Sequence, residues 1–296
     1  MTLVIAVTTP ESIWLLADRR LTYPNSRTKD TARKIMSLEA DDGVALIGYS
    51  GLGATAFGTE PSDWMSAVLR GRRLPLEQLL DVLASAIKEH IPEKLKKRRP
   101  GHIHQVLIPA FVKRKARLYT IALVASNAIS DIKLEYQRQI LDVTHPHSNV
   151  PPRLAIAGSG SRFFINNPLQ RKLMRLVKAS DRKKIRPELV ADALAELNYN
   201  VHKIDKSVGP SCIVTWRFRK SGGGVQFYTG TRRESSPGIP GIGAGMDISA
   251  IAALAMQYLL PSMQPALADG VTSNNNDTKF DQALSKLPGG PDEKLI

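Results

Sequence analysis

The order of apolar runs along the chain constrains its fold most. Strand-like runs come first, two helical patterns follow, strands return, a second helical pair follows, and strands come last. The expected strands are 2–8, 12–18, 32–40, 105–112, 117–125, 132–143, 153–158, 212–219 and 225–230, and the expected helices are 62–71, 75–91, 168–179 and 187–202. Two sheets stacked face to face, with helices on their outer sides, would bury each apolar face.

The length and composition of the chain fit one large core. Its 296 residues are 43% hydrophobic and 23% charged, so a core can form without disulfides. The lone Cys212 excludes an internal disulfide, fits a reducing compartment, and is expected to be a buried strand residue. The sequence shows no signal peptide and no apolar run of the roughly 20 residues that a membrane helix needs. We therefore expect a cytoplasmic protein with no membrane partner.

The first two apolar runs, 2–8 and 12–18, are expected to form a hairpin around a turn at 9–11. Thr2 would then be fixed in a strand, with only Met1 before it. Once Met1 is removed, Thr2 carries a hydroxyl nucleophile and an α-amine with a pKa of about 7.7–8.0, which can act as its base. Taken alone, Thr2 is more simply interpreted as an ordinary strand residue.

Two charged residues favour the chemical interpretation of Thr2. Asp18 ends the second apolar run, and Lys34 begins another after a polar loop. A lysine beside a nucleophile lowers the pKa of a neighbouring amine and stabilises developing negative charge, and a carboxylate compensates the buried lysine. The glycines of 45–53 follow a strand, where a backbone N–H could face a reacting carbonyl.

The pattern T-(x)15-D-x-R-x-T-(x)11-K, followed by glycines at 43, 48 and 51, resembles the proteasome β-subunit family of N-terminal-nucleophile (Ntn) hydrolases, of the bacterial proteasome homologue type. The resemblance implies that Thr2 is the nucleophile and that Asp18 and Lys34 form its supporting pair. It also implies that Arg20 is a structural partner and that Gly48 donates the oxyanion N–H. From their positions, Thr22, Arg20 and Ser50 are assigned to the substrate pocket.

Two later segments bear on the same site. The run 158–161, Gly-Ser-Gly-Ser, is typical of a flexible turn before a helix, but it also resembles a family element whose first serine, here Ser159, supports the amine of the nucleophile. A further family element matches at Asp205 and Gly209, but Val208 stands at its serine position. Ser207 lies one residue early and could take that role in a shifted loop. An inactive relative therefore stays open.

The resemblance implies an α+β fold, a four-layer αββα sandwich of two stacked, mainly antiparallel sheets flanked by helical pairs, the Ntn-hydrolase fold. We assign this domain to residues 1–230. Residues 231–265 are expected to form a glycine-rich linker and an apolar C-terminal helix at 246–260, packed on the body or on a neighbouring subunit. The polar segment 266–296 is expected to be a disordered tail.

The chain is basic, with 41 Lys and Arg against 27 Asp and Glu and a net charge of +14. The excess is clustered at 94–99, 113–117 and 171–186, and such patches bind nucleic acid or steer acidic peptides. No reading motif or interleaved aromatics accompany them, which disfavours nucleic acid. The histidine pairs 102/104 and 145/147 lack acidic or cysteine partners at a diagnostic spacing, so we expect them in surface loops, with no metal and no cofactor.

The sequence thus predicts a threonine-type amide or peptide hydrolase, a self-compartmentalising peptidase acting on unfolded polypeptides or peptides. The resemblance implies a homo-oligomeric ring, and the absence of an ATP-binding motif assigns any ATP-dependent unfoldase to a separate partner. Two alternatives stay open: a catalytically inactive ring or scaffold protein, and a basic nucleic-acid-binding protein.

Overall fold

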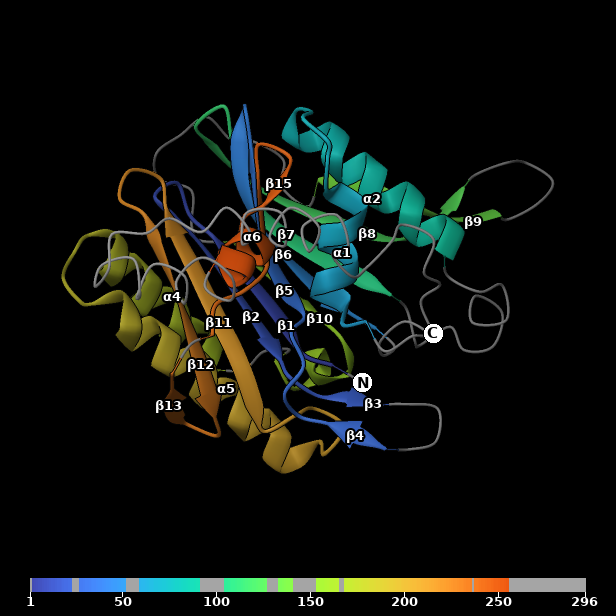
Figure 1. Ribbon diagram of the computed structural model, residues 1–296. Helices are drawn as coiled ribbons and strands as arrows, with labels where there is room; N and C mark the ends of the chain where they lie inside the picture. Colours follow the sequence, from blue (N-terminus) through green and yellow to red (C-terminus); the bar gives the residue numbers. More distant parts are fainter. Residues whose placement is uncertain are drawn as a thin grey trace, which may run out of the picture.

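A computed structural model describes residues 2–22, 27–51, 59–90, 104–126, 133–140, 153–164, 168–235 and 237–255 (Figure 1). Its strands are β1 Val4–Thr8, β2 Ser12–Asp18, β3 Leu21–Thr22, β4 Thr28–Lys29, β5 Ile35–Ala40, β6 Gly43–Ser50, β7 Gln105–Val112, β8 Lys115–Ser126, β9 Lys133–Ile140, β10 Arg153–Ala157, β11 Ser211–Phe218, β12 Gly223–Thr229, β13 Arg232–Glu234, β14 Gly241–Gly243 and β15 Met246–Asp247. The helices are α1 Pro61–Leu69, α2 Leu76–His90, α4 Pro168–Asp181, α5 Pro187–Ile204 and α6 Ile248–Leu254, with a 3₁₀ turn, η1, at Ser159–Phe163. The expected hairpin, helical pairs and closing strands are confirmed at these positions.

The β1–β2 hairpin lies inside a six-stranded sheet of order β10-β1-β2-β11-β12-β13. Its turn is held by Thr9, whose Oγ1 accepts hydrogen bonds from the N–H groups of Ser12 at 2.8 Å and Glu11 at 3.1 Å. This local bonding sets the register, in which Val4 faces Ala17. Since β1 and β2 are buried along their whole length, the start of β1 and the end of β2 come together inside the molecule.

A seven-stranded sheet of order β15-β14-β5-β6-β7-β8-β9 faces the six-stranded sheet. The apolar side chains between the two include Val4, Leu15, Leu46, Leu107 and Ile213. The residues before and after each of these in its strand point to the opposite face of the sheet, because side chains alternate along a strand. The two sheets therefore enclose one buried seam, and the hairpin forms one wall of it.

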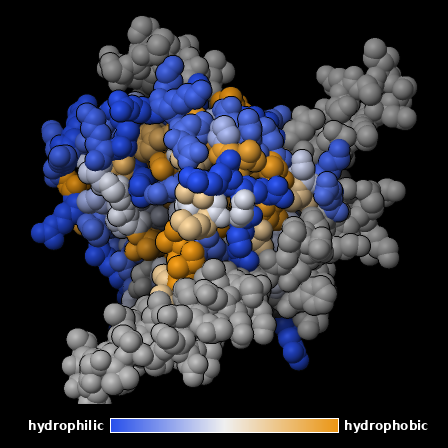
Figure 2. Space-filling model, turned by 45° about the horizontal axis from the view of Figure 1, so that its top comes forward, coloured by the Kyte–Doolittle hydropathy of each residue, from blue (hydrophilic) through white to orange (hydrophobic). Residues whose placement is uncertain are grey.

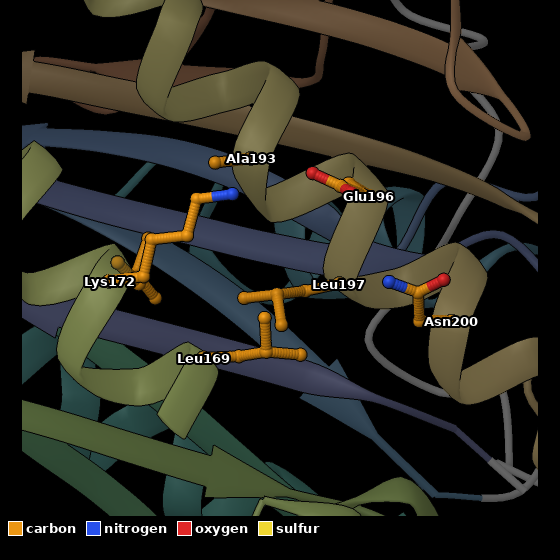
Figure 3. A pocket seen from close by; sticks show the side chains of 7 residues that line it. Leu169, Lys172, Ala193, Glu196, Leu197 and Asn200 are labelled. Carbon is orange, nitrogen blue, oxygen red and sulfur yellow. The ribbon is translucent and has the colours of Figure 1, made fainter. Parts of the chain in front are cut away.

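Helices cover the outer sides of these sheets (Figure 1). Helices α1 and α2 pack on the seven-stranded sheet, and α4 and α5 pack on the six-stranded one. Leu169 of α4 and Leu197 of α5 meet between the second pair, beside Lys172, Glu196 and Asn200 (Figure 3). The space left there is only about 10 Å³, so the two helices are closely packed.

The predicted fold class, a four-layer αββα sandwich built from two sheets, was wrong. The described residues form three sheets, of six, seven and two strands, and contain more strand than helix. The third sheet is the short ribbon β3–β4, and β14 adds a parallel pairing with β5. The pattern of apolar residues could not show either feature, because two-residue strands and glycine-rich strands carry no periodic signal.

The C-terminal part of the described chain adds to the seven-stranded sheet. Residues 241–243, within the expected glycine-rich linker, form β14, and α6 lies in the expected apolar helix. Met246 and Ile248 are 54% and 49% exposed, and hydrophobic side chains gather near the centre of one face of the molecule (Figure 2). The domain boundary at 230 stays a prediction, and the expected tail at 266–296 lies outside the described residues.

The structure also bears on the expected burial of Cys212 and on membrane-spanning helices. Cys212 is a fully buried residue of β11, as predicted. None of the helices in the described residues has the length and hydropathy to cross a membrane.

Candidate active site

Thr2, Asp18 and Lys34 meet at one end of the buried seam. The Nζ of Lys34 lies 3.0 Å from Thr2 Oγ1 and 3.0 Å from Asp18 Oδ1. Their exposed fractions are 2%, 0% and 1% for Thr2, Asp18 and Lys34. A lysine shielded from water thus bridges a hydroxyl and a carboxylate that lie far apart in the sequence.

The fold explains why these three residues meet. Thr2 precedes β1 and Asp18 ends β2, and the N–H of Asp18 donates to the carbonyl of Leu3 at 3.0 Å. Lys34 comes from the other sheet, just before β5, where its carbonyl accepts from the N–H of Tyr49 at 3.0 Å. The group therefore joins both large sheets at the point where their strand ends coincide.

Four N–H donors saturate the Asp18 carboxylate. Its Oδ1 accepts from the N–H of Leu3 at 3.0 Å and from Lys34, and its Oδ2 accepts from the N–H groups of Arg20 at 3.1 Å and Gly209 at 2.9 Å. Only one of these donors is charged. The carboxylate is therefore rigidly oriented and its negative charge is shared among four groups.

The environment of Lys34 disfavours its charged form. Burial lowers the pKa of Lys34, and the attraction of Asp18 opposes this shift without cancelling it. A lysine in this state releases its proton more readily than an exposed one. The Nζ of Lys34 donates to Thr2 Oγ1, so an N–H group of the lysine points at the hydroxyl oxygen of Thr2.

Gly158 closes the site on the other side of Thr2. Its φ is +91°, and a Cβ built there would lie 1.8 Å from the carbonyl oxygen of Thr2 and 3.0 Å from Ser50 Oγ. Only glycine permits this backbone to approach so closely. The expected pocket residue Ser50, which is 2% exposed, therefore lies beside Thr2.

A second hydrogen-bonded chain follows Gly158. Ser159 Oγ lies 3.2 Å from Ser207 Oγ, and Ser207 donates to Asp205 Oδ1 through its Oγ at 2.5 Å and its N–H at 3.0 Å. Burial acts to raise the pKa of Asp205, but the bonds from Ser207 and Arg162 outweigh it, so the pKa is lowered. Ser159, Ser207 and Asp205 are thus brought together as one group.

Val208 itself cannot replace a serine in this chain. Its side chain is fully buried among the apolar residues beneath α5. The tight loop after α5 bonds the N–H of Val208 to the carbonyl of Asp205 at 3.1 Å, which turns Ser207 toward Ser159. Ser207, and not the residue at position 208, therefore lies beside Ser159, and its role in holding the amine stays a prediction.

The same loop supports Asp18 from behind. A Cβ on Gly209 would lie 2.8 Å from the Cβ of Arg20, so the loop packs directly on the backbone that holds the carboxylate. Arg20 is fixed by Asp30, with Nε–Oδ1 and Nη2–Oδ2 distances of 2.6 and 2.7 Å, and it donates to the carbonyl of Lys206. These contacts fix Arg20 beside Asp18, and its supporting role stays a prediction.

Sequence reasoning missed Asn198 in this support. Asn198 is completely buried on α5, and its Nδ2 donates to the carbonyl of Gly209 at 3.0 Å. A single asparagine on an amphipathic helix gives no signal of such a contact. Gly158, in contrast, could have been found from its place in the Gly-Ser-Gly-Ser run.

Gly48 and Thr22 occupy strand positions that do not test their expected roles. Gly48 is an interior residue of β6, paired with Ile35 on one side and Leu107 on the other. Thr22 is half-buried in β3, opposite Thr28, and no hydrogen bond of the described chain links it to Thr2. The oxyanion role of Gly48 and the pocket role of Thr22 stay predictions.

The expectation of surface histidines was wrong for His104. Its side chain is 2% exposed, its Nδ1 is hydrogen-bonded to the hydroxyl of Tyr49, and burial lowers its pKa to about 4. The other three members of the pairs, at 102, 145 and 147, lie outside the described residues. Within the described ranges, no group of three His, Cys, Asp or Glu side chains could hold a metal ion.

The two basic clusters that fall in the described residues are on the surface. Cluster 94–99 falls outside the described residues. Lys113 and Arg114 form the exposed β7–β8 turn, and the basic side chains of cluster 171–186 are exposed on α4 and the turn that follows it.

Comparisons with known proteins give structural similarity only. No protein-family model matches this chain, and no curated relative matches it. It is similar to the solved structure of Anbu (ancestral beta-subunit) from Yersinia bercovieri, with a TM-score of 0.43 and 13% identity, over 72% of this chain and 80% of that chain. It is also similar to the Anbu (Gly-1) mutant from Hyphomicrobium sp. strain MC1, with a TM-score of 0.44 and 12% identity, over 92% of this chain and 99% of that chain.

The expected membership in the bacterial proteasome homologue type of β-subunit was therefore wrong. The similar structures are Anbu proteins, which are proteasome-like but distinct from that type. The motif that suggested the assignment consists of single residues in the first fifty positions. Such a pattern constrains the geometry around Thr2 and leaves the type of subunit open.

Proposed function

We propose that this chain is a threonine-type amide hydrolase with Thr2 as its nucleophile. One observation carries the proposal: the buried Nζ of Lys34 lies 3.0 Å from both Thr2 Oγ1 and Asp18 Oδ1. Burying a lysine and a carboxylate is costly, and a strand-end threonine gains no packing from either. The same three groups are what an activated hydroxyl needs, namely a nucleophile, a neighbour that stabilises its charge, and a carboxylate that orients that neighbour.

The reaction begins when cleavage before Thr2 frees its α-amine. The amine, directly or through a water, takes the proton of Oγ as Oγ bonds to a peptide carbonyl carbon. Lys34 lowers the pKa of the amine and of the hydroxyl by its charge, and the N–H of Gly48 receives the oxyanion. The C–N bond then breaks, the amine product leaves with the transferred proton, and water hydrolyses the ester at Thr2.

The chain from Ser159 through Ser207 to Asp205 would hold the freed amine in place. Ser159 follows Gly158, whose backbone lies against the carbonyl of Thr2. A Cβ at Gly158 would also lie 3.0 Å from Ser50 Oγ, so Ser50 lies near the same point. We assign Ser50 and Thr22 to the substrate pocket, with unfolded polypeptides or peptides as substrates.

Assembly into a homo-oligomeric ring would shield cellular proteins from this site. Closed symmetric homo-oligomers are the commonest kind of assembly, and the exposed Met246 and Ile248 give apolar surface that such a contact could cover. Native mass spectrometry tests this part, and a mass equal to one chain contradicts it. An ATP-dependent unfoldase would be a separate chain.

Covalent labelling tests the nucleophile. A peptide carrying a hydroxyl-reactive electrophile should form an adduct that peptide mass spectrometry locates at Thr2, and intact mass should show that Met1 has gone. Thr2→Ala should abolish labelling and peptide hydrolysis without altering the fold. The matched control is Thr8→Ala at the other end of β1, which is 3% exposed and should keep both. Labelling of Thr2→Ala equal to that of the native protein refutes the proposal.

A catalytically inactive scaffold is the second candidate, and Val208 favours it. The serine expected at that position is absent, and Ser207 reaches the network only through a shifted loop. In that case Thr2 would resist labelling while the assembled mass stayed the same.

A further inference from the structure

A concavity of about 490 Å³ lies at the opposite end of the sheets from Thr2. Three turns wall it: the β5–β6 turn at 41–42, the β7–β8 turn at 113–114 and the β11–β12 turn at 219–222. We call it the tip concavity. Strand β6 runs from it to Ser50 beside Thr2, which at about 3.3 Å per residue separates the two sites by roughly 20 Å. Its volume falls in the range of about 300–1,000 Å³ typical of small-ligand sites.

Positive charge dominates the wall of the tip concavity. Five Lys and Arg side chains line it against two carboxylates. Three of the five, Lys113, Arg114 and Lys220, are exposed and form no ion pair with the described part of the chain. One of the two carboxylates is already engaged, since Asp42 Oδ1 accepts from the N–H of Leu76 at 2.7 Å, at the start of α2.

The other two cations, Arg217 and Arg219, are each held by an ion pair with a glutamate that does not line the concavity. Arg217 lies 2.9 Å from Glu39, and Arg219 lies 2.6 Å from Glu11. A guanidinium has five N–H donors, so each pair leaves donors for a ligand. The carboxylates therefore hold the two arginines in place rather than filling the concavity.

The backbone of the β7–β8 turn gives separate evidence that Lys113 and Arg114 are there for a purpose other than local stability. It is a two-residue hairpin loop, because Val112 pairs with Lys115 across it. Lys113 and Arg114 have φ values of 47° and 66°, as a type I′ turn requires. Asn-Gly is the dipeptide that such a turn favours, because side chains with a Cβ are strained there. Two long cations thus occupy positions where local stability favours other residues.

We propose that the tip concavity binds a compact oligophosphate, a ligand with several linked phosphoryl groups. Ammonium and guanidinium groups approach it from the β7–β8 turn and from the β11–β12 turn. A phosphoryl group offers oxygens on several sides and accepts paired N–H donors from arginine, whereas a carboxylate offers both oxygens on one side. The arrangement of donors on facing turns therefore fits phosphate better.

Calorimetric titration of the full chain with inorganic tripolyphosphate tests the proposal. At low ionic strength, about 50 mM salt, saturable binding to one site is expected, and it should weaken as salt is added. Citrate, a carboxylate of comparable charge, should bind at least tenfold more weakly. A short oligonucleotide with as many phosphates distinguishes the source of the ligand: binding of the oligonucleotide alone assigns the site to nucleic-acid backbone, and binding of tripolyphosphate alone assigns it to a free oligophosphate.

The variant Lys113→Asn/Arg114→Gly separates charge from structure. It removes two cations and installs the favoured turn, so binding should fall at least tenfold while the melting temperature stays the same or rises. Asp41→Asn removes a negative charge that repels the anionic ligand at the rim of the concavity, and it should tighten binding about threefold. Matched controls are Arg171→Gln/Arg175→Gln on α4 and Thr2→Ala, both of which should bind as the native chain does.

Three results would each overturn the proposal: no saturable binding by the native chain, native affinity in the double turn variant, or equal affinity for citrate. Lys220→Gln tests the β11–β12 turn in the same way, and its affinity for tripolyphosphate should be about fivefold lower than that of the native chain. It keeps the question answerable if the turn variant fails to fold.

Discussion

Replacing Asp18 by Asn tests the electrostatic account of the site most directly. The change removes the carboxylate that pairs with the buried Lys34 ammonium at 3.0 Å, the one ion pair that Lys34 forms within the described residues. It also turns one carboxylate oxygen into an NH₂ group that faces donors, because both oxygens accept two N–H groups each. Breaking a buried ion pair on one side costs about 3–5 kcal/mol, and each donor left unsatisfied costs about 1–3 kcal/mol.

The cost of leaving the Lys34 charge unpaired in Asp18→Asn has an upper limit, which is the free energy of releasing the proton of Lys34. An unpaired Lys34 can become neutral, and for a lysine with an ordinary pKa of about 10.4 this costs about 4.6 kcal/mol at pH 7 but only about 1.9 kcal/mol at pH 9. In the variant the folded state then binds one proton fewer than the unfolded state, so its stability rises with pH up to the unfolded pKa. The native chain gains less over this range because Asp18 opposes the loss of the proton.

Urea unfolding at pH 7 and pH 9 measures this difference. We expect Asp18→Asn to be less stable than the native chain by about 5 kcal/mol at pH 7 and by clearly less at pH 9. Asp18→Asn/Lys34→Met should be more stable than Asp18→Asn alone at pH 7. The matched control is Asp192→Asn at the exposed pair with Arg233, where a loss below about 1 kcal/mol is expected. A loss under about 1 kcal/mol for Asp18→Asn at pH 7, or one equal at both pH values, refutes the reasoning.

Three further predictions concern neighbours of the site. Gly158→Ala should cost at least about 2 kcal/mol in urea unfolding and disorder Thr2, whereas Gly71→Ala, which has a similar φ of +77° and nothing within 4 Å, should cost less; equal losses would contradict the close contact with Thr2. Because burial lowers the pKa of His104 to about 4, the unfolded state takes up a proton first as the pH falls from 6.5, so stability should drop by about 3 kcal/mol by pH 4; His104→Gln should flatten this profile, and an unchanged profile would exclude His104 as its cause. Ser207→Ala should reduce peptide hydrolysis about tenfold with little change in stability, whereas Val208→Ser should mainly destabilise the chain by burying a hydroxyl; restored activity in Ser207→Ala/Val208→Ser would show that position 208 reaches the network after all.

Periodicity in the sequence was sufficient to locate most elements, because their apolar faces are long. Helix α5 shows this, since Val190, Leu194, Leu197 and Val201 recur at helical spacing and all are buried. The third sheet and β14 lacked such a signal. Strand β14 is Gly-Ile-Gly, a composition that indicates a linker, and its pairing with β5 depends on backbone groups from a distant segment.

The spacing of residues in the sequence also indicated Thr2, Asp18 and Lys34, but it could not predict the contacts that hold Asp18 in place. The N–H of Gly209 and the amide of Asn198 act through backbone contacts that no side-chain pattern encodes. His104 shows the opposite error. The lack of acidic or cysteine partners near the histidine pairs suggested surface loops, whereas the hydroxyl of Tyr49 gives His104 a buried partner.

The division of the Asp18 charge among several donors bears on the protonation of Lys34. If Asp18 were devoted to Lys34 alone, the pair would favour the ammonium and keep its proton firmly bound. Instead three backbone N–H groups, from Leu3, Arg20 and Gly209, take part of the same negative charge. Burial therefore prevails and the pKa of Lys34 is lowered. The three donors belong to the residue before β1, the segment after β2 and the loop after α5, so the packing of three separate segments also influences the pKa of the lysine next to Thr2.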